Sequence, residues 1–459
     1  MDLHDLDILA LASLLGRRRV SPREVLQTAL DRIERLNPSL NAFLSLRAGA
    51  MRDAIAAERV LRAGRSRSPL CGIPISVKDI VLAKDEPTTA GSRCFGDGLV
   101  SDTDAPVIRG LRRAGAIIVG RTNLHELALG VTTVNEHFGP ARNPWDIQRV
   151  SGGSSGGSAV AVAARMGAAS VGTDTRGSIR IPAACCGIVG LKPTRGLVST
   201  AGVIPLSPTL DHVGPMTRSV VDAAAMLGPM TGRARMSGVW LRACGRGVRR
   251  LRVGVSEYHL RDLDSEVQRR IDSALTVVRR LGVVLVDAPL PAVDDVQQAS
   301  VVITAAEAVA YHDRILQSDP GAFGPLVRQR LEGGYRWRAL DYVRAMNVRA
   351  RFKAEIATCF RSVDVAIGAT LPALPPRIDE HAVHINGQPA NTVDAFSRLN
   401  SPQNMAGIPA MSIPAGLSAS GLPVGLQLIA GHGREDLLFA LGAAVQRESD
   451  WHLRMPRME

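Results

Sequence analysis

Residues 151–194 read SGGSSGGSAVAVAARMGAASVGTDTRGSIRIPAACCGIVGLKPT. This stretch places two serines, Ser154 and Ser178, in two glycine-rich turns that are separated by a run of small side chains. Upstream, the segment GIPISVKD carries Lys78, and none of the ten histidines falls inside the glycine-rich stretch. A lysine and two serines in tight loops therefore predict a serine hydrolase that uses no histidine.

The scarcity of lysine supports a chemical role for Lys78. Four of the 55 basic residues are lysines, namely Lys78, Lys84, Lys192 and Lys353. Arginine keeps its proton in proteins, whereas burial can lower the pKa of a lysine until the amine is neutral. A neutral lysine can accept the proton of a serine, and a second serine can relay that proton. We expect this role for Lys78, a loop-holding role for Lys192 and no chemical role for the other two.

The glycines predict a site for a developing negative charge. The segment GTDTRGS would bring consecutive backbone N–H groups to one point beside Ser178, as in an oxyanion hole. A single Gly–Ser turn is also compatible with an ordinary loop or a phosphate cradle. A phosphate loop requires the pattern G-x-x-x-x-G-K-S/T, which is absent from the chain.

The composition limits the kinds of partner and the cellular compartment that we expect. The chain has 459 residues, 46% of them hydrophobic, which predicts a globular protein with a large core. The net charge is +12, but the arginines are scattered, and we expect no nucleic-acid partner. The six cysteines fit neither a zinc site nor a disulfide scaffold, and no apolar run is long enough to span a membrane. These features predict a cytoplasmic protein with no membrane association.

Strands that alternate with helices predict an α/β fold. Expected strands include GIPISVKDIVL, IIVGRTN, LRVGVSEY and LPVGLQLIAG, and expected helices include residues 158–169 and 265–282. We expect residues 1–70 to form an N-terminal helical segment that packs on the core. Residues 71–459 are expected to form a single α/β domain with a variable helical insert near 290–360.

The chain resembles the amidase signature family. The matching motifs are GIPISVKD at 72–79, SGGSSGGSAVAVAA at 151–164, GTDTRGSIRIPAACCGIVGLKPT at 172–194 and SIPAGLSASGLPVGLQLIAG at 412–431. The resemblance covers nearly the whole chain and is weakest at 290–390. It implies the amidase signature fold, a large mixed twisted β-sheet surrounded by helices.

The resemblance also implies the roles of individual residues. Ser178 matches the nucleophile, Lys78 matches the base, and Ser154 matches the bridging serine, which the family holds in a cis peptide after Gly153. No metal and no cofactor are implied. The implied oxyanion loop comprises the amides of Thr175, Arg176, Gly177 and Ser178, and the implied supporting residues are Ser155, Asp174 and Arg180. For the last two, bracing of the loop is favoured over contact with substrate.

Arg176 departs from the family pattern, in which this position is glycine or another small residue. Its backbone N–H survives the substitution, so catalysis is compatible with it. Two placements remain open for the side chain. It either enters the acyl pocket, where it pairs with a carboxylate or limits substrate size, or points away and forms an ion pair. Variable segments usually line the substrate pocket, and here we expect them at 132–135, 300–345 and 370–376.

The leading functional prediction is a free-standing hydrolase that cleaves the C–N bond of small or aryl carboxylic amides through an acyl-enzyme on Ser178. It would act on a small-molecule substrate as a monomer or homodimer. One alternative has carbamates or esters as the main substrates. Another is the amidase subunit of a tRNA-dependent amidotransferase, which delivers ammonia to a partner that binds tRNA. That subunit typically has glycine at position 176 and glutamine at position 181, so Arg176 and Ile181 are interpreted as evidence against it. A non-catalytic binding protein is a further alternative.

Overall fold

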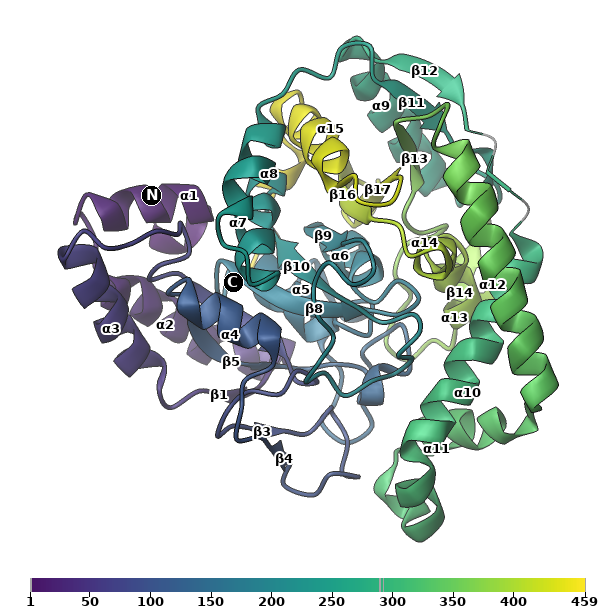
Figure 1. The fold of residues 1–459 in the computed structure, drawn as a ribbon, viewed down its shortest axis with the longest axis horizontal. Coiled ribbons are helices and arrows are strands. Elements are labelled where there is room, and N and C mark those ends of the chain that lie inside the picture. Colours follow the sequence, from purple (N-terminus) through teal and green to yellow (C-terminus); the bar gives the residue numbers. More distant parts are fainter. Residues whose placement is uncertain (1, 289, 292, 459) are drawn as a thin grey trace.

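The computed structural model describes residues 2–288, 290–291 and 293–458 (Figure 1). Its centre is a mixed sheet of eleven strands in the order β1-β5-β2-β8-β10-β9-β16-β17-β13-β11-β12. Strands β5, β2 and β8 run parallel, as do β13, β11 and β12, and antiparallel pairings join these two groups. The predicted large mixed sheet surrounded by helices is confirmed.

The strands of the central sheet have the following bounds along the chain: β1 Phe43–Leu46, β2 Pro74–Lys78, β5 Ile117–Thr122, β8 Ala169–Asp174, β9 Val189–Lys192, β10 His212–Thr217, β11 Arg252–Val255, β12 Val284–Asp287, β13 Val365–Ala369, β16 Ala410–Leu417 and β17 Pro423–Ala430. Three small two-stranded sheets lie outside it: β3 Pro87–Thr88 with β4 Leu99–Val100, β6 Arg142–Asn143 with β7 Asp146–Val150, and β14 Ala382–Ile385 with β15 Gln388–Asn391.

The α-helices have these bounds: α1 Ile8–Gly16, α2 Pro22–Leu40, α3 Ala50–Arg62, α4 Pro106–Arg113, α5 Gly156–Ala163, α6 Arg180–Cys186, α7 Val220–Met230, α8 Met236–Cys244, α9 Ser265–Arg280, α10 Asp294–Ser318, α11 Pro325–Glu332, α12 Ala339–Cys359, α13 Thr392–Arg398, α14 Ser401–Ala406 and α15 Glu435–Arg447. None of the described helices is both long and apolar enough to cross a lipid bilayer.

Local sequence explains where several helices begin. At α2, the Ser21 hydroxyl accepts a hydrogen bond from the Glu24 amide, and the Glu24 carboxylate accepts one from the Ser21 amide. This reciprocal capping, with Pro22 in the first helical position, satisfies two amides that would otherwise lack partners. The apolar positions of α2 then face the core at Val25, Leu26 and Ala29.

Helices cover both faces of the sheet. Within β5, Ile118 belongs to one hydrophobic cluster, whereas Ile117 and Val119 belong to another. Because successive strand side chains point to opposite faces, these clusters lie on opposite sides of the sheet. The first packs α4, α7, α8, α9 and α15 against the sheet, and the second packs α2, α3, α5 and α6.

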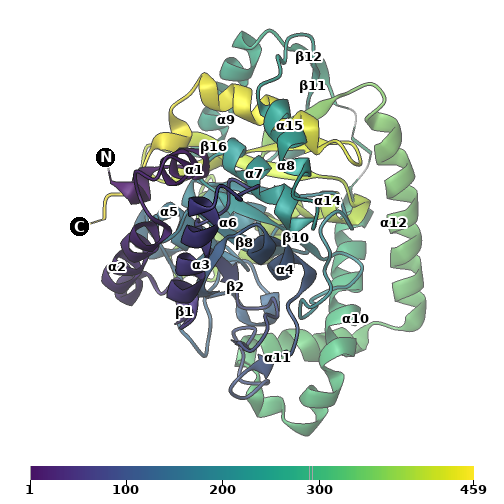
Figure 2. The ribbon, with the colours of Figure 1, turned by 60° about the vertical axis from the view of Figure 1, so that its left-hand side comes forward.

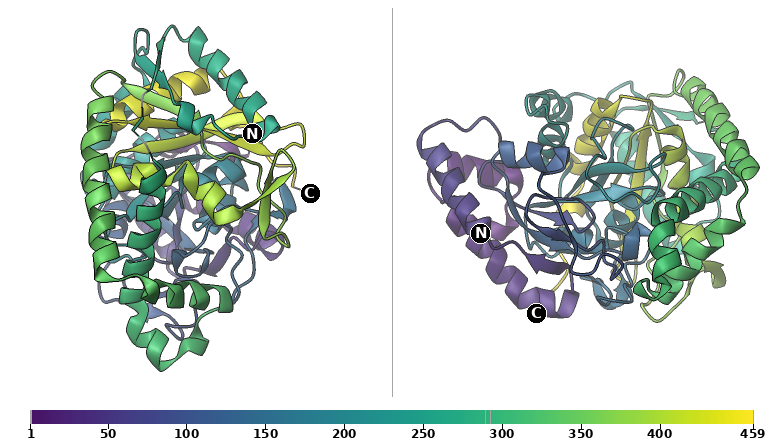
Figure 3. Two further views of the ribbon diagram at one scale, coloured as in Figure 1. Left: turned by 90° about the vertical axis from the view of Figure 1, so that its right-hand side faces the viewer. Right: turned by 60° about the horizontal axis from the view of Figure 1, so that its bottom comes forward.

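Helices form two opposite flanks of the molecule. Helices α1–α3 lie at one flank and α10–α12 at the opposite flank (Figures 1 and 2). Helices α10 and α12 run side by side along that flank, with α11 near one end of the pair (Figure 3). A third hydrophobic cluster joins α10 and α12 to α14, so this flank packs on the chain's C-terminal part.

Two local predictions were wrong. The helix expected at 158–169 ends at Ala163, because the chain turns and the Ala168 amide joins the Pro74 carbonyl at the start of β8. The N-terminal segment expected to be helical also contains strand β1, which pairs antiparallel with β5. The proposed division of the chain at residue 70 stays a prediction.

Candidate functional site

The candidate site lies where two neighbouring parallel strands end. Strands β2 and β8 pair in register at Val77 and Val171, and they end at Lys78 and Asp174. Because the carboxyl ends of parallel strands meet at the same edge of a sheet, the loops that follow are placed together. Lys78 is thereby brought beside the segment that carries Ser178.

Lys78 is fully buried and makes two short contacts. Its Nζ donates to Ser154 Oγ at 2.7 Å and to Thr173 Oγ1 at 2.8 Å. Burial lowers the pKa of Lys78 to about 7, although the negative charges of Asp211 and Asp174 oppose the shift. Desolvation disfavours the ammonium form, so the neutral amine that a general base requires is populated near neutral pH.

The Ser154 loop is held from several sides. The Gly153–Ser154 peptide is cis, as the family resemblance implied. The Thr133 hydroxyl donates to the Gly152 carbonyl at 2.9 Å and accepts from the Gly156 amide at 3.1 Å. These contacts fix the loop at the point where α5 begins.

A buried ion pair stabilises the loop that carries Ser178. Arg180 and Asp174 are both fully buried, and the Arg180 guanidinium donates two hydrogen bonds of 3.0 Å to the carboxylate. Asp174 also accepts from the amides of Gly177 and Ile179 at 2.8 and 3.2 Å. Burial by itself would raise the pKa of Asp174, but the charge of Arg180 and its hydrogen bonds outweigh burial and hold that pKa below its usual range.

The oxyanion loop differs from the prediction at one residue. The Gly177 amide, expected to point at the reacting oxygen, donates to Asp174 instead. Within the described residues, the amides of Thr175, Arg176 and Ser178 have no backbone acceptor. Gly177 has φ = +120°, and a Cβ there would lie 2.7 Å from both Asn400 and Ile181, so this position requires glycine.

Ser155 connects the two serine loops. Its amide donates to the Ser178 carbonyl at 3.2 Å, and its hydroxyl donates to the Thr173 carbonyl at 3.1 Å. Ser155 was expected to support the relay through a hydrogen bond, and that role stays a prediction. Lys192 lies on β9, where Nζ donates to the Ile408 carbonyl at 2.6 Å, as expected for a lysine that holds a loop.

A cavity of about 310 Å³ opens beside Ser178. Ser178 is 6% exposed and lines this cavity together with Arg176. Of the three segments expected to line the pocket, 300–345 does so, whereas 128–131 and 393–397 take the places of 132–135 and 370–376. Helix α10 contributes Val301, Thr304, Ala305 and Ala308, and the stretch around α11 contributes Gln329, Arg330, Gly333, Arg336 and Trp337.

Arg176 lines the pocket. Its Nε donates to Ser401 Oγ at 3.3 Å, and within the described part of the chain no carboxylate lies at ion-pair distance from it. The alternative in which Arg176 points away and forms an ion pair is therefore wrong. The physical reason is that the Ser178 loop faces the cavity, so a side chain two residues earlier reaches the same space.

Sequence reasoning missed three residues of the site. Thr173 contacts Lys78, and Asp211 accepts from the Thr175 hydroxyl at 2.6 Å. His125 lies outside the glycine-rich stretch, yet its amide donates to the Ser154 carbonyl at 3.1 Å. Burial, followed by the charges of Arg330 and Lys78, lowers the pKa of His125 to about 3, so its ring is neutral. Long-range contacts bring Asp211 and His125 to the site, whereas Thr173 lies within the glycine-rich stretch, near the end of β8.

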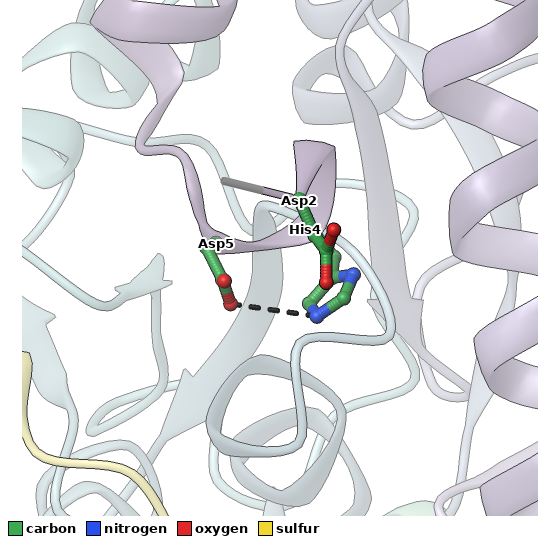
Figure 4. Close-up of side chains that lie close together, drawn as sticks. All are labelled: Asp2, His4 and Asp5. Atoms are coloured by element: carbon green, nitrogen blue, oxygen red, sulfur yellow. Dashed lines mark ion pairs between the residues drawn. The ribbon is translucent and has the colours of Figure 1, made fainter.

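A second polar group lies far from this cavity, near the N-terminus. Asp2, His4 and Asp5 place their ligand atoms close together, with His4 Nε2 3.4 Å from Asp5 Oδ1 (Figure 4). Two arginines surround the group: Arg165 donates to Asp5, and Arg32 Nη1 lies 3.4 Å from His4 Nε2. These cations already neutralise the carboxylate charge, so the group carries no argument for a metal ion.

Comparison with known proteins identifies the family. The family model described as Amidase matches residues 24–439. The chain belongs to the amidase family. A solved structure described as an amidase is 34% identical, with a TM-score of 0.88 over 96% of this chain and 99% of that one, which confirms the amidase signature fold. As a member of this family, the protein is an enzyme of the amidohydrolase or amidotransferase type.

The curated relatives correct the functional prediction. A glutamyl-tRNA(Gln) amidotransferase subunit of Geobacter sp. (strain M21) is 36% identical over 99% of both chains. The protein of the same name from Chloroflexus aurantiacus is 38% identical over 100% of this chain and 99% of its own. The prediction of a free-standing hydrolase of small or aryl amides, carbamates or esters is therefore wrong. The expectation of a monomer or homodimer with no nucleic acid is overturned by the same finding.

Arg176 and Ile181 had been interpreted as evidence against the amidotransferase. The sequence similarity to these amidotransferase subunits extends over the whole chain and outweighs the two differing residues. Ile181 is fully buried in α6, and Arg176 lies in the cavity beside Ser178. Substitutions at such positions alter packing or the substrate pocket and do not report on the partners with which an amidase-family protein assembles.

Proposed function

We propose that this chain is the amidase subunit of an amidotransferase assembly that acts on a charged tRNA. In this role it releases ammonia from a linear carboxamide, and a partner subunit uses that ammonia. The observation that carries the proposal is the full-length similarity to two proteins named as a glutamyl-tRNA(Gln) amidotransferase subunit. The cytoplasmic setting expected from cysteine usage belongs to the same proposal.

The chemistry follows from the contacts of Lys78. Neutral Lys78 accepts the proton of Ser154, and Ser154 accepts the proton of Ser178 as the Ser178 oxygen attacks the amide carbon. The new O–C bond forms while the carbonyl π electrons move to the oxygen, which the loop amides stabilise. The short Lys78–Ser154 distance and the lowered pKa of Lys78 support this direction of proton flow.

Collapse of the intermediate breaks the C–N bond. The proton returns through Ser154 to the leaving nitrogen, which departs as ammonia, and Ser178 is left as an ester. Water then loses a proton to the same relay and attacks the ester carbon. The acid departs and Ser178 regains its proton, so the enzyme is unchanged and the net consumption is one water for each ammonia released.

The proton relay of the proposed mechanism is buried. Lys78 and Ser154 are fully buried, so the proton relay is shielded from bulk water. Ser178 opens to the cavity beside α10 and α11, where an amide can reach the nucleophile. In the proposed assembly, ammonia formed at Ser178 passes to the partner that binds tRNA.

The test is a tRNA amidation assay on the assembly purified from its native source through a tagged copy of this chain. We expect conversion of glutamyl-tRNA(Gln) to glutaminyl-tRNA(Gln) with an amide donor. The Ser178→Ala assembly should lose amide-dependent conversion but retain conversion driven by added ammonium chloride. If the tagged chain purifies alone and leaves glutamyl-tRNA(Gln) unchanged with either nitrogen source, the proposal is contradicted.

A further inference from the structure

The sequence scatters its arginines along the chain, but the fold gathers a group of them on one flank. Two cavities of about 450 and 540 Å³ are lined by α3, α4, β1, β5 and the loops beside them. Arg47 and Arg112 line both cavities, so the two adjoin at these residues, and together we call them the basic groove. Its charged lining consists of the cations Arg47, Arg52, Arg65, Arg67, Lys84, Arg112, Arg113 and Arg121 and the carboxylates Asp53, Asp85 and Glu86.

Two of the three carboxylates in the groove already have cationic partners. Arg47 donates to Asp53 at 2.5 Å and to Glu86 at 2.6 Å. Arg112 donates to the same oxygen of Glu86 at 2.6 Å, and it also donates to Asp104 at 2.8 Å. These contacts use the charges of Arg47 and Arg112 within the protein. They leave the other cations of the groove without Asp53 and Glu86 as counter-charges.

Five exposed cations of the groove have no partner. Among the described residues, no hydrogen bond and no ion pair is made by the side chains of Arg52, Arg65, Arg67, Lys84 and Arg113. The carboxylate that remains in the lining is that of Asp85, which is itself exposed. Positive charge that is concentrated in a concave surface attracts anions from solution.

A buried arginine of the groove also lacks an acceptor. Arg121 is 2% exposed and lines the larger cavity. Its Nη1 donates to the Val81 carbonyl at 2.6 Å, and its Nε lies 3.4 Å from a Glu86 oxygen. Its Nη2 has no hydrogen-bond partner in the described part of the chain. Because a buried donor without an acceptor is unfavourable, an anion in this cavity would supply the missing acceptor.

The lining suits phosphate groups and not bases. Arginine presents a planar fork of donors that matches the oxygens of a phosphate. No aromatic side chain is among the described residues that line either cavity, so the groove offers no ring on which a base could stack. A chain of phosphates can follow a concave groove, whereas a flat lipid surface follows it less closely. These features favour a nucleic-acid backbone, which is bound largely through charge.

We infer that the basic groove binds the phosphate backbone of RNA, and that its occupant is the tRNA on which the proposed assembly acts. The choice of tRNA rests on the proposed function. The groove shares no lining residue with the Ser178 cavity, and it lies beside the flank of α1–α3, away from α10–α12 (Figures 1 and 2). RNA held in the groove therefore leaves the Ser178 cavity free for the amide.

The test is a titration of a fluorescently labelled tRNA(Gln) transcript with the full-length chain, followed by anisotropy at several salt concentrations. The groove variant combines Arg52→Gln, Arg65→Gln, Arg67→Gln and Arg113→Gln. We expect it to bind at least about tenfold more weakly at about 0.1 M salt. The slope of log K against log salt should also fall in magnitude by about 3, since each phosphate contact contributes about 0.9. The unmodified chain should bind an unrelated tRNA within about threefold, because phosphates carry no sequence information.

The matched control removes the same number of charges from another surface. It combines Arg249→Gln, Arg269→Gln, Arg279→Gln and Arg280→Gln. These exposed arginines lie on or near α9, on the other side of the molecule from α3 (Figure 1). We expect RNA affinity to change by less than about twofold, because charges beyond the screening length contribute little. Both variants should keep the unfolding midpoint of the unmodified chain, since exposed side chains without partners contribute little to stability.

Several outcomes would overturn the inference. They are equal weakening in the two variants, RNA binding that survives in the groove variant, and no binding by the unmodified chain up to about 100 µM. Binding to phosphatidylglycerol vesicles without binding to RNA would overturn it as well. The titration contains no amide and no partner subunit, so it is separate from the amidation assay. Failure of amidation with loss of RNA binding in the groove variant would contradict the proposed function alone. Amidation with equal RNA binding by both variants would contradict the groove alone.

Discussion

Lys78 Nζ and Ser154 Oγ lie 2.7 Å apart, although 76 residues separate them in the chain. The contact joins the end of β2 to the loop before α5, in a region from which solvent is excluded. A hydrogen bond of this length allows a proton to pass between the two groups, provided that the amine is neutral. The proposed chemistry depends on this relationship.

Removal of any member of the proposed relay should abolish ammonia release. Ser178→Ala removes the nucleophile, and we expect kcat to fall by at least about a thousandfold. Lys78→Met and Ser154→Ala should each lower kcat by about a hundredfold or more, because they remove the general base or its relay. Lys84→Met is the matched control for lysine, since Lys84 is exposed and should leave kcat unchanged. A Lys78→Met enzyme with normal kcat would contradict the assignment.

The pH dependence should follow the protonation of Lys78. Its pKa is lowered to about 7, and only the neutral amine can accept a proton, so kcat/KM should fall as the pH drops below about 7. Above that pH the rate should approach a plateau. A profile of kcat/KM from pH 5 to 9 checks this expectation. An unchanged rate at pH 5.5 would show that Lys78 is not the base.

Asp211 should influence the pH at which kcat/KM begins to fall. Its negative charge favours the ammonium form of Lys78, and burial raises the pKa of Asp211 itself to about 6. In Asp211→Asn this charge is absent, so the pKa of Lys78 should fall and activity should persist to lower pH. The effect should be greatest between about pH 6 and pH 7, where Asp211 is ionised in the unmodified enzyme and much of Lys78 is still protonated. Asp379→Asn, at an exposed carboxylate, should not move the profile.

Thr173 should contribute to orienting the lysine. Thr173→Val keeps the shape of the side chain but removes the acceptor that lies 2.8 Å from Lys78 Nζ. We expect kcat to fall by about tenfold, the effect of losing one hydrogen bond to this group. Thr217→Val is a matched control, because Thr217 is likewise buried and lies at the opposite end of the β8–β10 pairing. Similar losses in both variants would indicate a general effect on the sheet.

The Asp174–Arg180 pair should be important for stability. Arg180→Met leaves the Asp174 carboxylate buried without its charge partner, and we expect the free energy of unfolding to fall by about 3–5 kcal/mol. Asp364→Asn breaks the partly exposed pair with Arg252 and should cost less than about 1 kcal/mol. Urea unfolding followed by circular dichroism provides the measurement. Equal unfolding midpoints for the two variants would contradict a bracing role for the buried pair.

Local sequence was sufficient for much of the fold. The β-branched run before Lys78 forms β2, and the amphipathic stretch after Asp264 forms helix α9 at Ser265–Arg280, within two residues of the predicted end. Such elements are determined by short-range periodicity and by caps. Strand β1 could not be predicted in this way, because its pairing with β5 joins Phe43 to Thr122 across a long stretch of chain.

By itself, the sequence determined the family, the glycine-rich loops and the candidates Lys78, Ser154 and Ser178, because these depend on residue types at fixed spacing. Only the tertiary structure decided what surrounds them. Thr173 meets Lys78 through the pairing of β2 with β8, Asp211 accepts a hydrogen bond from Thr175, and Arg176 lines the cavity. The lowered pKa of Lys78 likewise arises from burial. The spacing of residues along the chain does not show that Lys78 is buried, because distant segments together exclude water from its amine.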